Sequence, residues 1–140
     1  MRVQDVMTAD PSTVLPTDSL RTARDRMTTA GCRRLPVVDE AGIIVGIITD
    51  RDVRLALNSP LVMRERWQDD LLLDHTEVDA CMTVDPICIA PDAPLEDAID
   101  LLLARKISGL PVVEEGRLVG IVTVTDLLRA LLQLLRAAGG

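Results

Sequence analysis

Aromatic side chains are almost absent from this sequence, and this absence narrows the classes of partner. There is no Phe and no Tyr, and Trp67 is the single tryptophan. A chain with one aromatic residue offers no platform on which successive nucleic-acid bases could stack. The net charge is −7, whereas proteins that bind DNA or RNA present basic faces. Both observations argue against a nucleic-acid partner.

The residues that most catalytic and metal sites need are equally scarce. His75 is the only histidine and lies in the linker among Asp74 and Glu77, with nothing to place it beside a nucleophile, so no Ser/His/Asp or Cys/His system is indicated. The three cysteines are odd in number and lack zinc-ligand spacing, which predicts reduced, mostly buried thiols. No glycine-rich phosphate loop of the P-loop or dinucleotide type is present. The sequence therefore predicts no catalysis of its own and no dedicated metal site.

Long apolar runs are also lacking. No stretch approaches the roughly 20 residues that a membrane helix needs, and the N-terminus has no signal-peptide profile. We therefore expect a cytoplasmic protein with no membrane partner. With 140 residues, the chain is long enough for a core but leaves no room for a separate catalytic domain.

What the sequence does contain is an internal duplication. Three pairs of segments match in the same order: MTADP at 7–11 with MTVDP at 82–86, LPVV at 35–38 and again at 110–113, and GIIT at 46–49 with GIVT at 120–123. The second half is one residue shorter between its last two matches, at a turn, where a repeat tolerates such a loss.

Each half is predicted to fold as β-α-β-β-α from its apolar periodicity and turn signals. The expected strands are 12–15, 35–38 and 43–49 in the first half, and 87–90, 110–113 and 117–123 in the second. The expected helices are 20–30 and 51–57, then one that begins near Leu95 and one at 125–138. A half of about sixty residues is too small to bury its sheet alone. We therefore predict an α+β fold of two β-α-β-β-α repeats, 1–57 and 79–138, packed sheet to sheet about a pseudo-twofold axis.

Residues 58–78 are predicted to be a linker helix. Met63, Trp67 and Leu71 share one helical face. Packing of this face onto the domain is one interpretation. The other makes Trp67 a contact for a partner or ligand, because lone aromatic residues often anchor interfaces.

The closing helix is apolar beyond a single stripe. It carries six leucines between 127 and 135, and a monomer would leave much of this surface in water. We expect a homodimer that pairs these helices, with a regulated partner protein as the alternative.

The most informative pattern is Gly-Ile-(Ile/Val)-Thr-x-x-Asp, which occurs at 46–52 and, with Thr123 and Asp126, in the second half. It is typical of a buried strand that runs directly into a helix. The helix N-terminus, with its unpaired N–H groups and positive dipole end, can hold a phosphate. The two acceptor oxygens of the aspartate could take both hydroxyls of a ribose. Thr-x-x-Asp is also a variant of the capping box, so helix capping alone remains an alternative for each copy.

Taken together, the duplicated motifs resemble those of a cystathionine-β-synthase (CBS) domain pair, or Bateman module, of the stand-alone bacterial type. The resemblance spans roughly residues 3–135 and depends on two matching copies. It implies a regulatory protein that binds an adenosine nucleotide (AMP, ADP or ATP) in clefts between the halves, one cleft per half. Mg²⁺ would accompany a bound polyphosphate.

The resemblance also implies which residues bind the ligand. The adenine lies among apolar strand residues, the aspartate holds the ribose, and the threonine with nearby cations holds phosphate. The first cleft would use Thr13, Val14, Arg34, Leu35, Pro36, Thr49, Arg51 and Asp52. The second would use Cys88, Ile89, Gly109, Leu110, Pro111, Thr123, Thr125 and Asp126.

The two clefts differ in charge. Arg33, Arg34 and Arg51 surround the first motif, and their counterparts in the second are uncharged: Ser108, Gly109 and Thr125. Residues 1–66 carry a net charge of +1 and residues 67–140 a net charge of −8. We predict that the first cleft binds the more highly phosphorylated nucleotide, and that the second binds a monophosphate, a nucleoside-like ligand or nothing. The alternatives are that the arginines form a solvated face, and that the protein is a dimeric scaffold without a ligand.

Overall fold

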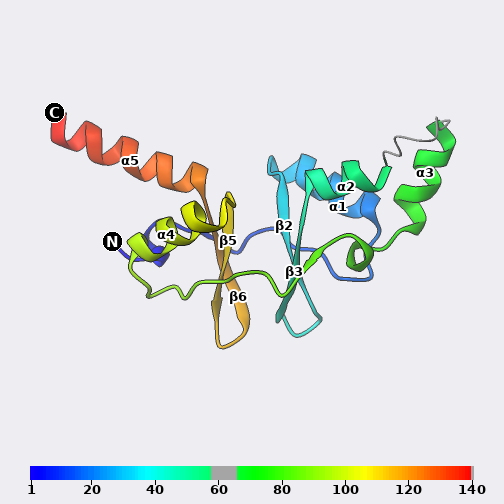
Figure 1. Cartoon of the computed structure of the whole chain (residues 1–140), viewed down its shortest axis with the longest axis horizontal. Helices are drawn as coiled ribbons and strands as arrows, with labels where there is room; N and C mark the ends of the chain where they lie inside the picture. The colour runs from blue at the N-terminus through cyan, green and yellow to red at the C-terminus, as the bar shows by residue number, and fades with distance from the viewer. Residues whose placement is uncertain (58–65, 140) are drawn as a thin grey trace. The chain divides into compact units, whose positions relative to one another are not determined.

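The computed structural model describes residues 1–57 and 66–139, which form two compact units. We call Ser12–Pro86 the first unit, and Met1–Pro11 together with Ile87–Gly140 the second unit. Each unit contains a three-stranded antiparallel sheet with helices (Figure 1). Mixed helix and sheet in two similar units confirms the α+β class predicted from the sequence.

The sheet of the first unit is built on the predicted hairpin. Strands β2 (Arg34–Val38) and β3 (Ile44–Thr49) pair with a register shift next to Val37. Strand β4 (Thr83–Val84) pairs with the other edge of β3. Gly46 permits this pairing, because a Cβ at this position would lie 2.8 Å from the carbonyl oxygen of Thr83.

Three helices complete the first unit. Helix α1 (Leu20–Ala30) begins at Ser19, whose hydroxyl accepts a backbone N–H of the first turn. It ends at Gly31, which adopts the left-handed conformation. Helix α2 (Asp50–Leu57) continues directly from β3, and helix α3 (Arg66–His75) lies in the predicted linker region.

The second unit repeats this plan. Strands β5 (Gly109–Glu114) and β6 (Arg117–Thr123) form the predicted hairpin, and β1 (Thr8–Ala9) pairs with the other edge of β6. Helix α4 (Leu95–Arg105) precedes the hairpin, and helix α5 (Val124–Gly139) continues directly from β6.

Short 3₁₀ helices lie before the two edge strands, at Val3–Asp5 and Val78–Ala80. Each edge strand thus pairs with the hairpin of the other sequence repeat: β1, from the first repeat, with β6, and β4, from the second, with β3. The two repeats have exchanged their leading segments.

The predicted strands 12–15 and 87–90 are wrong as extended strands. Each is reduced to one isolated pair, Val14 with Val37 and Ile89 with Val112. Both segments are bracketed by prolines, which lack a backbone N–H and cannot extend the ladder. The segments still lie beside β2 and β5, because Val14 and Ile89 each donate to and accept from the neighbouring strand.

Each unit has its own apolar core. The first core includes Val14, Leu20, Leu35, Ile48, Val53 and Leu73. The second includes Val3, Ile89, Ala98, Leu110, Val112 and Val122. Val3 of the N-terminal segment is fully buried in the second core, so the exchanged segment contributes packing as well as a strand.

The linker helix packs differently from the prediction. Leu73 is buried in the first core, whereas Trp67 is 59% exposed and Leu71 48% exposed. The interpretation of a linker helix packed onto the domain therefore holds through Leu73, but the face of Trp67 and Leu71 is exposed, and Met63 lies outside the described residues. Ion pairs from Arg21 of α1 to acidic residues of α3 add to the Leu73 contact.

Candidate functional site

The predicted phosphate and ribose residues of the first unit lie at the junction of β3 and α2. The carboxylate of Asp52 accepts the backbone N–H of Thr49 at 2.9 Å, and the hydroxyl of Thr49 accepts the backbone N–H of Asp52 at 3.1 Å. This reciprocal pair is a capping box. It fixes the start of α2 and holds the aspartate one turn inside the helix.

Other predicted residues of the first site lie beside this junction. Arg34 is paired with Thr49 across the hairpin. The segment that contains Thr13 and Val14 is fixed by a 3.2 Å hydrogen bond from the N–H of Val14 to the carbonyl of Pro36. The strand pairing therefore places Arg34 at the β3–α2 junction, whereas Val14 lies beside Val37, three residues further along β2.

The apolar residues of this set have a second role. Leu35 and Val14 are fully buried in the first core. Both residues are therefore committed to packing and offer no exposed surface to a ligand.

The cations of the first site differ in their surroundings. Burial lowers the pKa of the Arg34 guanidinium, because desolvation disfavours its charged form. Arg51, in the first turn of α2, is exposed. A half-buried and an exposed guanidinium thus lie near the same helix start. Burial raises the pKa of the Cys81 thiol, and the negative charge of the nearby Asp52 adds to this rise.

The second unit contains the same junction between β6 and α5, with a different hydrogen-bond pattern. Oδ2 of Asp126 accepts the backbone N–H of Thr123 at 2.9 Å and its hydroxyl at 3.0 Å. Oδ1 accepts the hydroxyl of Thr8 on β1 at 3.1 Å, and Nη1 of Arg129 lies 4.0 Å from the same oxygen. Asp126 is 7% exposed. It is thus a buried carboxylate with hydrogen bonds to both oxygens.

The remaining predicted residues of the second site follow the arrangement of the first. Gly109 pairs with Thr123 across the hairpin, and the N–H of Ile89 donates to the carbonyl of Pro111. Leu110 is fully buried, and Thr125 is exposed. Cys88 is half-buried, and burial raises the pKa of its thiol.

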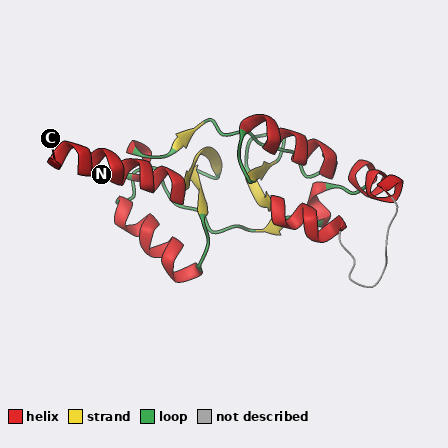
Figure 2. Cartoon of the chain, turned by 90° about the horizontal axis from the view of Figure 1, so that it is seen from above, coloured by secondary structure: helices red, strands yellow, loops and turns green. Residues whose placement is uncertain are grey.

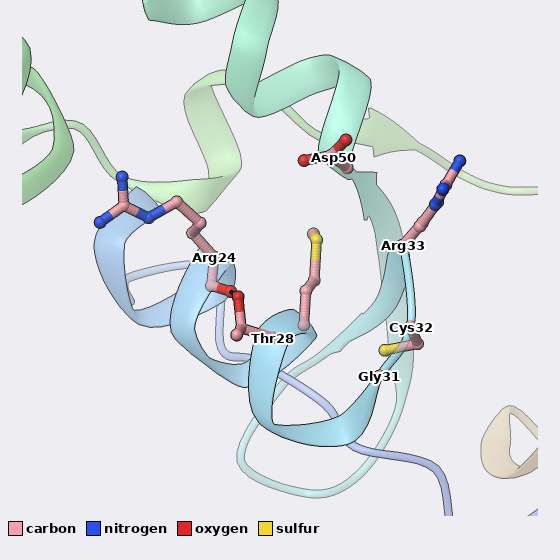
Figure 3. Close-up of a pocket in the computed structure, with 7 residues that line it drawn as sticks. Arg24, Thr28, Gly31, Cys32, Arg33 and Asp50 are labelled. Carbon is pink, nitrogen blue, oxygen red and sulfur yellow. Dashed lines mark hydrogen bonds between the residues drawn. The ribbon is translucent and has the colours of Figure 1, made fainter.

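A separate pocket of about 310 Å³ lies in the first unit between the end of α1 and the start of α2. It is lined by Arg24, Met27, Thr28, Gly31, Cys32, Arg33 and Asp50, none of which belongs to the predicted ligand set. Figure 3 shows the side chains of Arg24 and Arg33 pointing away from each other. The pocket therefore does not direct both guanidinium groups at one anion.

Helix α5 carries the largest apolar surface of the second unit. Leu128, Leu131, Leu132 and Leu135 are between 46% and 60% exposed. The last turns of α5 extend beyond the rest of this unit (Figure 2). Leu127 packs partly against the second core, so the base of the helix is anchored while its apolar face is uncovered within the chain.

Within residues 1–57 and 66–139, no helix is both long enough and apolar enough to cross a membrane. The same ranges contain no group of three or more His, Cys, Asp or Glu side chains placed to hold a metal ion.

Comparison with known proteins links both junctions to one family. The family model of the CBS domain matches residues 3–59 and 77–133. A CBS domain-containing protein of Dictyostelium discoideum is 37% identical over 135 residues, which cover 95% of this chain and 92% of the relative.

Solved structures of CBS-pair proteins are also similar to this chain. CBSX2 of Arabidopsis thaliana, crystallised in complex with AMP, is 33% identical with a TM-score of 0.80, over 94% of this chain and 97% of the other. The CBS domain pair of protein MJ0100, in complex with 5′-methylthioadenosine and S-adenosyl-L-methionine, is 30% identical with a TM-score of 0.78, over 94% of this chain and 95% of the other. With two matched domains covering most of its length, this chain belongs to the CBS-domain family as a tandem CBS pair.

Proposed function

We propose that this CBS pair is a regulatory protein that binds an adenosine nucleotide and has no catalysis of its own. The observation that carries the proposal is the carboxylate of Asp52. Its hydrogen bonds within the described residues are with Thr49, and they leave Oδ1 available for the hydroxyls of a ribose. Arg34 and Arg51 lie near the same helix start and offer charge for phosphate. The complexes of CBSX2 and MJ0100 with adenosine compounds support this ligand class.

The first test is calorimetric titration of AMP, ADP and ATP into the wild-type protein and into Asp52→Ala and Asp126→Ala. We expect ADP or ATP binding to be lost in Asp52→Ala and kept in Asp126→Ala. Circular dichroism of each variant checks that the loss of a capping residue has not unfolded it. Loss of binding in Asp126→Ala alone would show that we have assigned the wrong site.

We further propose that the arginines of the first site select the more highly phosphorylated nucleotide. Arg51→Gln should weaken ATP binding by about tenfold and AMP binding by much less, because the lost charge faces the outer phosphates. Arg54→Gln is the matched control: it makes the same charge change in the same helix, but Arg54 is paired with Asp50 on an exposed face. Equal effects of the two variants on ATP would assign the arginines to general surface charge. When ADP or ATP binds, Mg²⁺ would enter together with the polyphosphate.

A scaffold without a ligand is the second candidate, and the capping boxes favour it. Both Thr-x-x-Asp pairs have a sufficient structural role in fixing α2 and α5. Thermal unfolding separates the candidates, since a ligand at 100 times its Kd stabilises the folded state by about 2.7 kcal/mol. An unchanged midpoint in millimolar AMP, ADP and ATP would favour the scaffold.

We also propose that the protein is a homodimer in the cytoplasm, paired through α5. The leucines of α5 form a continuous exposed face at helical spacing, and a second copy would cover it. The double variant Leu131→Lys with Leu135→Lys should sediment as a monomer. Leu103→Lys, at another exposed leucine, is the control and should leave the mass unchanged. A wild-type monomer would leave this face to a regulated partner protein.

A further inference from the structure

The two aspartates that define the sites are not equally available, and a residue of the N-terminal segment contributes to the difference. Asp126 is 7% exposed, and both of its oxygens accept hydrogen bonds. Asp52 is only partly buried, and its hydrogen bonds in the described part of the chain are with Thr49. Asp126 has three contacts that, among the described residues, are not found at Asp52: the hydroxyl of Thr8 on Oδ1, the guanidinium of Arg129 at 4.0 Å from the same oxygen, and the hydroxyl of Thr123 on Oδ2.

Thr8 and Thr83 occupy matching positions on the two edge strands. Thr8 of β1 is opposite Ile121, and Thr83 of β4 is opposite Ile47, its counterpart in the other hairpin. Of these two threonines, only Thr8 donates a hydrogen bond to the aspartate of its unit in the described part of the chain. The asymmetry therefore does not follow from the sequence motif, which has a threonine in both places.

A ribose diol must donate its hydroxyl hydrogens to the carboxylate that recognises it. Oδ2 of Asp126 is already used by the backbone and side chain of Thr123, in bonds that hold the start of α5. Oδ1 is the remaining acceptor, and Thr8 occupies it from 3.1 Å. Oδ1 keeps a second lone pair, but Asp126 is only 7% exposed and Thr8 lies against this oxygen, so a ribose that uses Asp126 must compete with this hydroxyl.

We propose that Thr8 is a specificity-determining residue that competes with the ribose for Asp126 and keeps the second site closed to adenosine nucleotides. The proposal deepens the proposed function and depends on it for the ligand class. Strand β1 is only two residues long and exposed, but its pairing with β6 holds Thr8 beside Asp126.

The magnitude follows from the bond that must break. The bond from Thr8 to Asp126 is a hydrogen bond to a charged group, and a ligand must compete with it. Removal of the Thr8 hydroxyl should therefore tighten ligand binding at Asp126 by about tenfold. The same change at Thr83 should have no such effect, because its hydroxyl is not a partner of Asp52 in the structure. The two threonines thus form a matched pair for an experiment.

The test uses AMP as the probe and Asp52→Ala as the background, so that only the second site is measured. In this background Thr8→Ala should bind AMP at least tenfold more tightly than the parent. Thr8→Ser, which keeps the hydroxyl, should bind like the parent, and so should Thr83→Ala. Addition of Asp126→Ala should abolish the gain.

The outcomes separate this inference from the proposed function. AMP binding at Asp52 in the wild type, with no gain from Thr8→Ala, overturns the inference and leaves the proposed function in place. A gain from Thr8→Ala without any binding at Asp52 in the wild type supports the inference and shows that the proposed function has assigned the nucleotide to the wrong aspartate. If Thr8→Ala does not fold, the isosteric Thr8→Val replaces it, and equal AMP affinity of Thr8→Val and the parent would also overturn the inference.

Discussion

Substitution of Gly120 by alanine tests whether β1 is held in place as tightly as the structure indicates. A Cβ at this position would lie 2.6 Å from Sδ of Met7 and 2.9 Å from the carbonyl oxygen of Thr8. The methionine side chain can rotate away, but the carbonyl can be relieved only if β1 shifts. Overpacking of this kind costs about 1–3 kcal/mol of unfolding free energy.

A shift of β1 also lengthens the bond from Thr8 to Asp126. A hydrogen bond to a charged group contributes about 1.5–3 kcal/mol, so the total cost of Gly120→Ala should be about 2.5–6 kcal/mol. Gly46→Ala is the matched control. It places a Cβ 2.6 Å from Sδ of Met82 and 2.8 Å from a backbone carbonyl, but no bond to a buried aspartate is lost, so we expect about 1–3 kcal/mol.

Urea unfolding followed by far-UV circular dichroism measures both costs. The two variants should unfold at lower urea than the wild type, with Gly120→Ala the less stable. The same variant should gain AMP affinity at Asp126, because the shifted β1 releases that carboxylate. A cost for Gly120→Ala that is equal to or smaller than that for Gly46→Ala would refute the coupling between β1 and Asp126.

Two further predictions concern helix α4 and the α1–α3 contact. Lys106 ends α4 in the left-handed conformation, with φ of 54°, where the first unit has Gly31. Lys106→Gly should therefore stabilise the protein by about 0.5–1 kcal/mol, and Gly31→Ala should destabilise it by a similar amount. Urea unfolding measures both changes in the free energy of unfolding. The Arg21 guanidinium hydrogen-bonds Asp74 and lowers the pKa of that carboxyl, so the stabilisation from this pair is present above the unfolded pKa of about 3.9 and is lost as the pH falls through the lower folded value. The melting temperature of Arg21→Gln should therefore lie below that of the wild type at pH 7 and approach it near pH 2; a constant difference would contradict the linkage.

The hairpins and most helix boundaries could be predicted from the sequence, because their signals are local. Continuous apolar runs on either side of a short turn specify β2 with β3, and the left-handed Gly31 marks the end of α1. Lys106 gave no such signal, and α4 ends there all the same. The motif Thr-x-x-Asp likewise predicted both strand-to-helix junctions, with the reciprocal hydrogen bonds of a capping box.

The features that the sequence could not provide are contacts between distant residues. Thr8 and Asp126 are 118 residues apart, and no spacing rule relates them. The placement of β1 on β6 depends on which hairpin edge the segment reaches, and the duplicated motif offers two nearly identical edges. For the same reason, the difference in burial between Asp52 and Asp126 was not predictable from motifs that look alike.

The crossed pairing of the edge strands bears on how such a chain could arise and how it could be divided. In a single repeat, the outer edge of the hairpin would have no strand paired to it, and the leading strand would have no hairpin to pair with. Two copies are therefore complete only when each leading strand pairs with the hairpin of the other copy. An ancestor before gene duplication would then have been a pair of reciprocally joined half-length chains. Fragments cut between residues 58 and 65 should be incomplete when made separately and should reassemble when they are produced together in one cell.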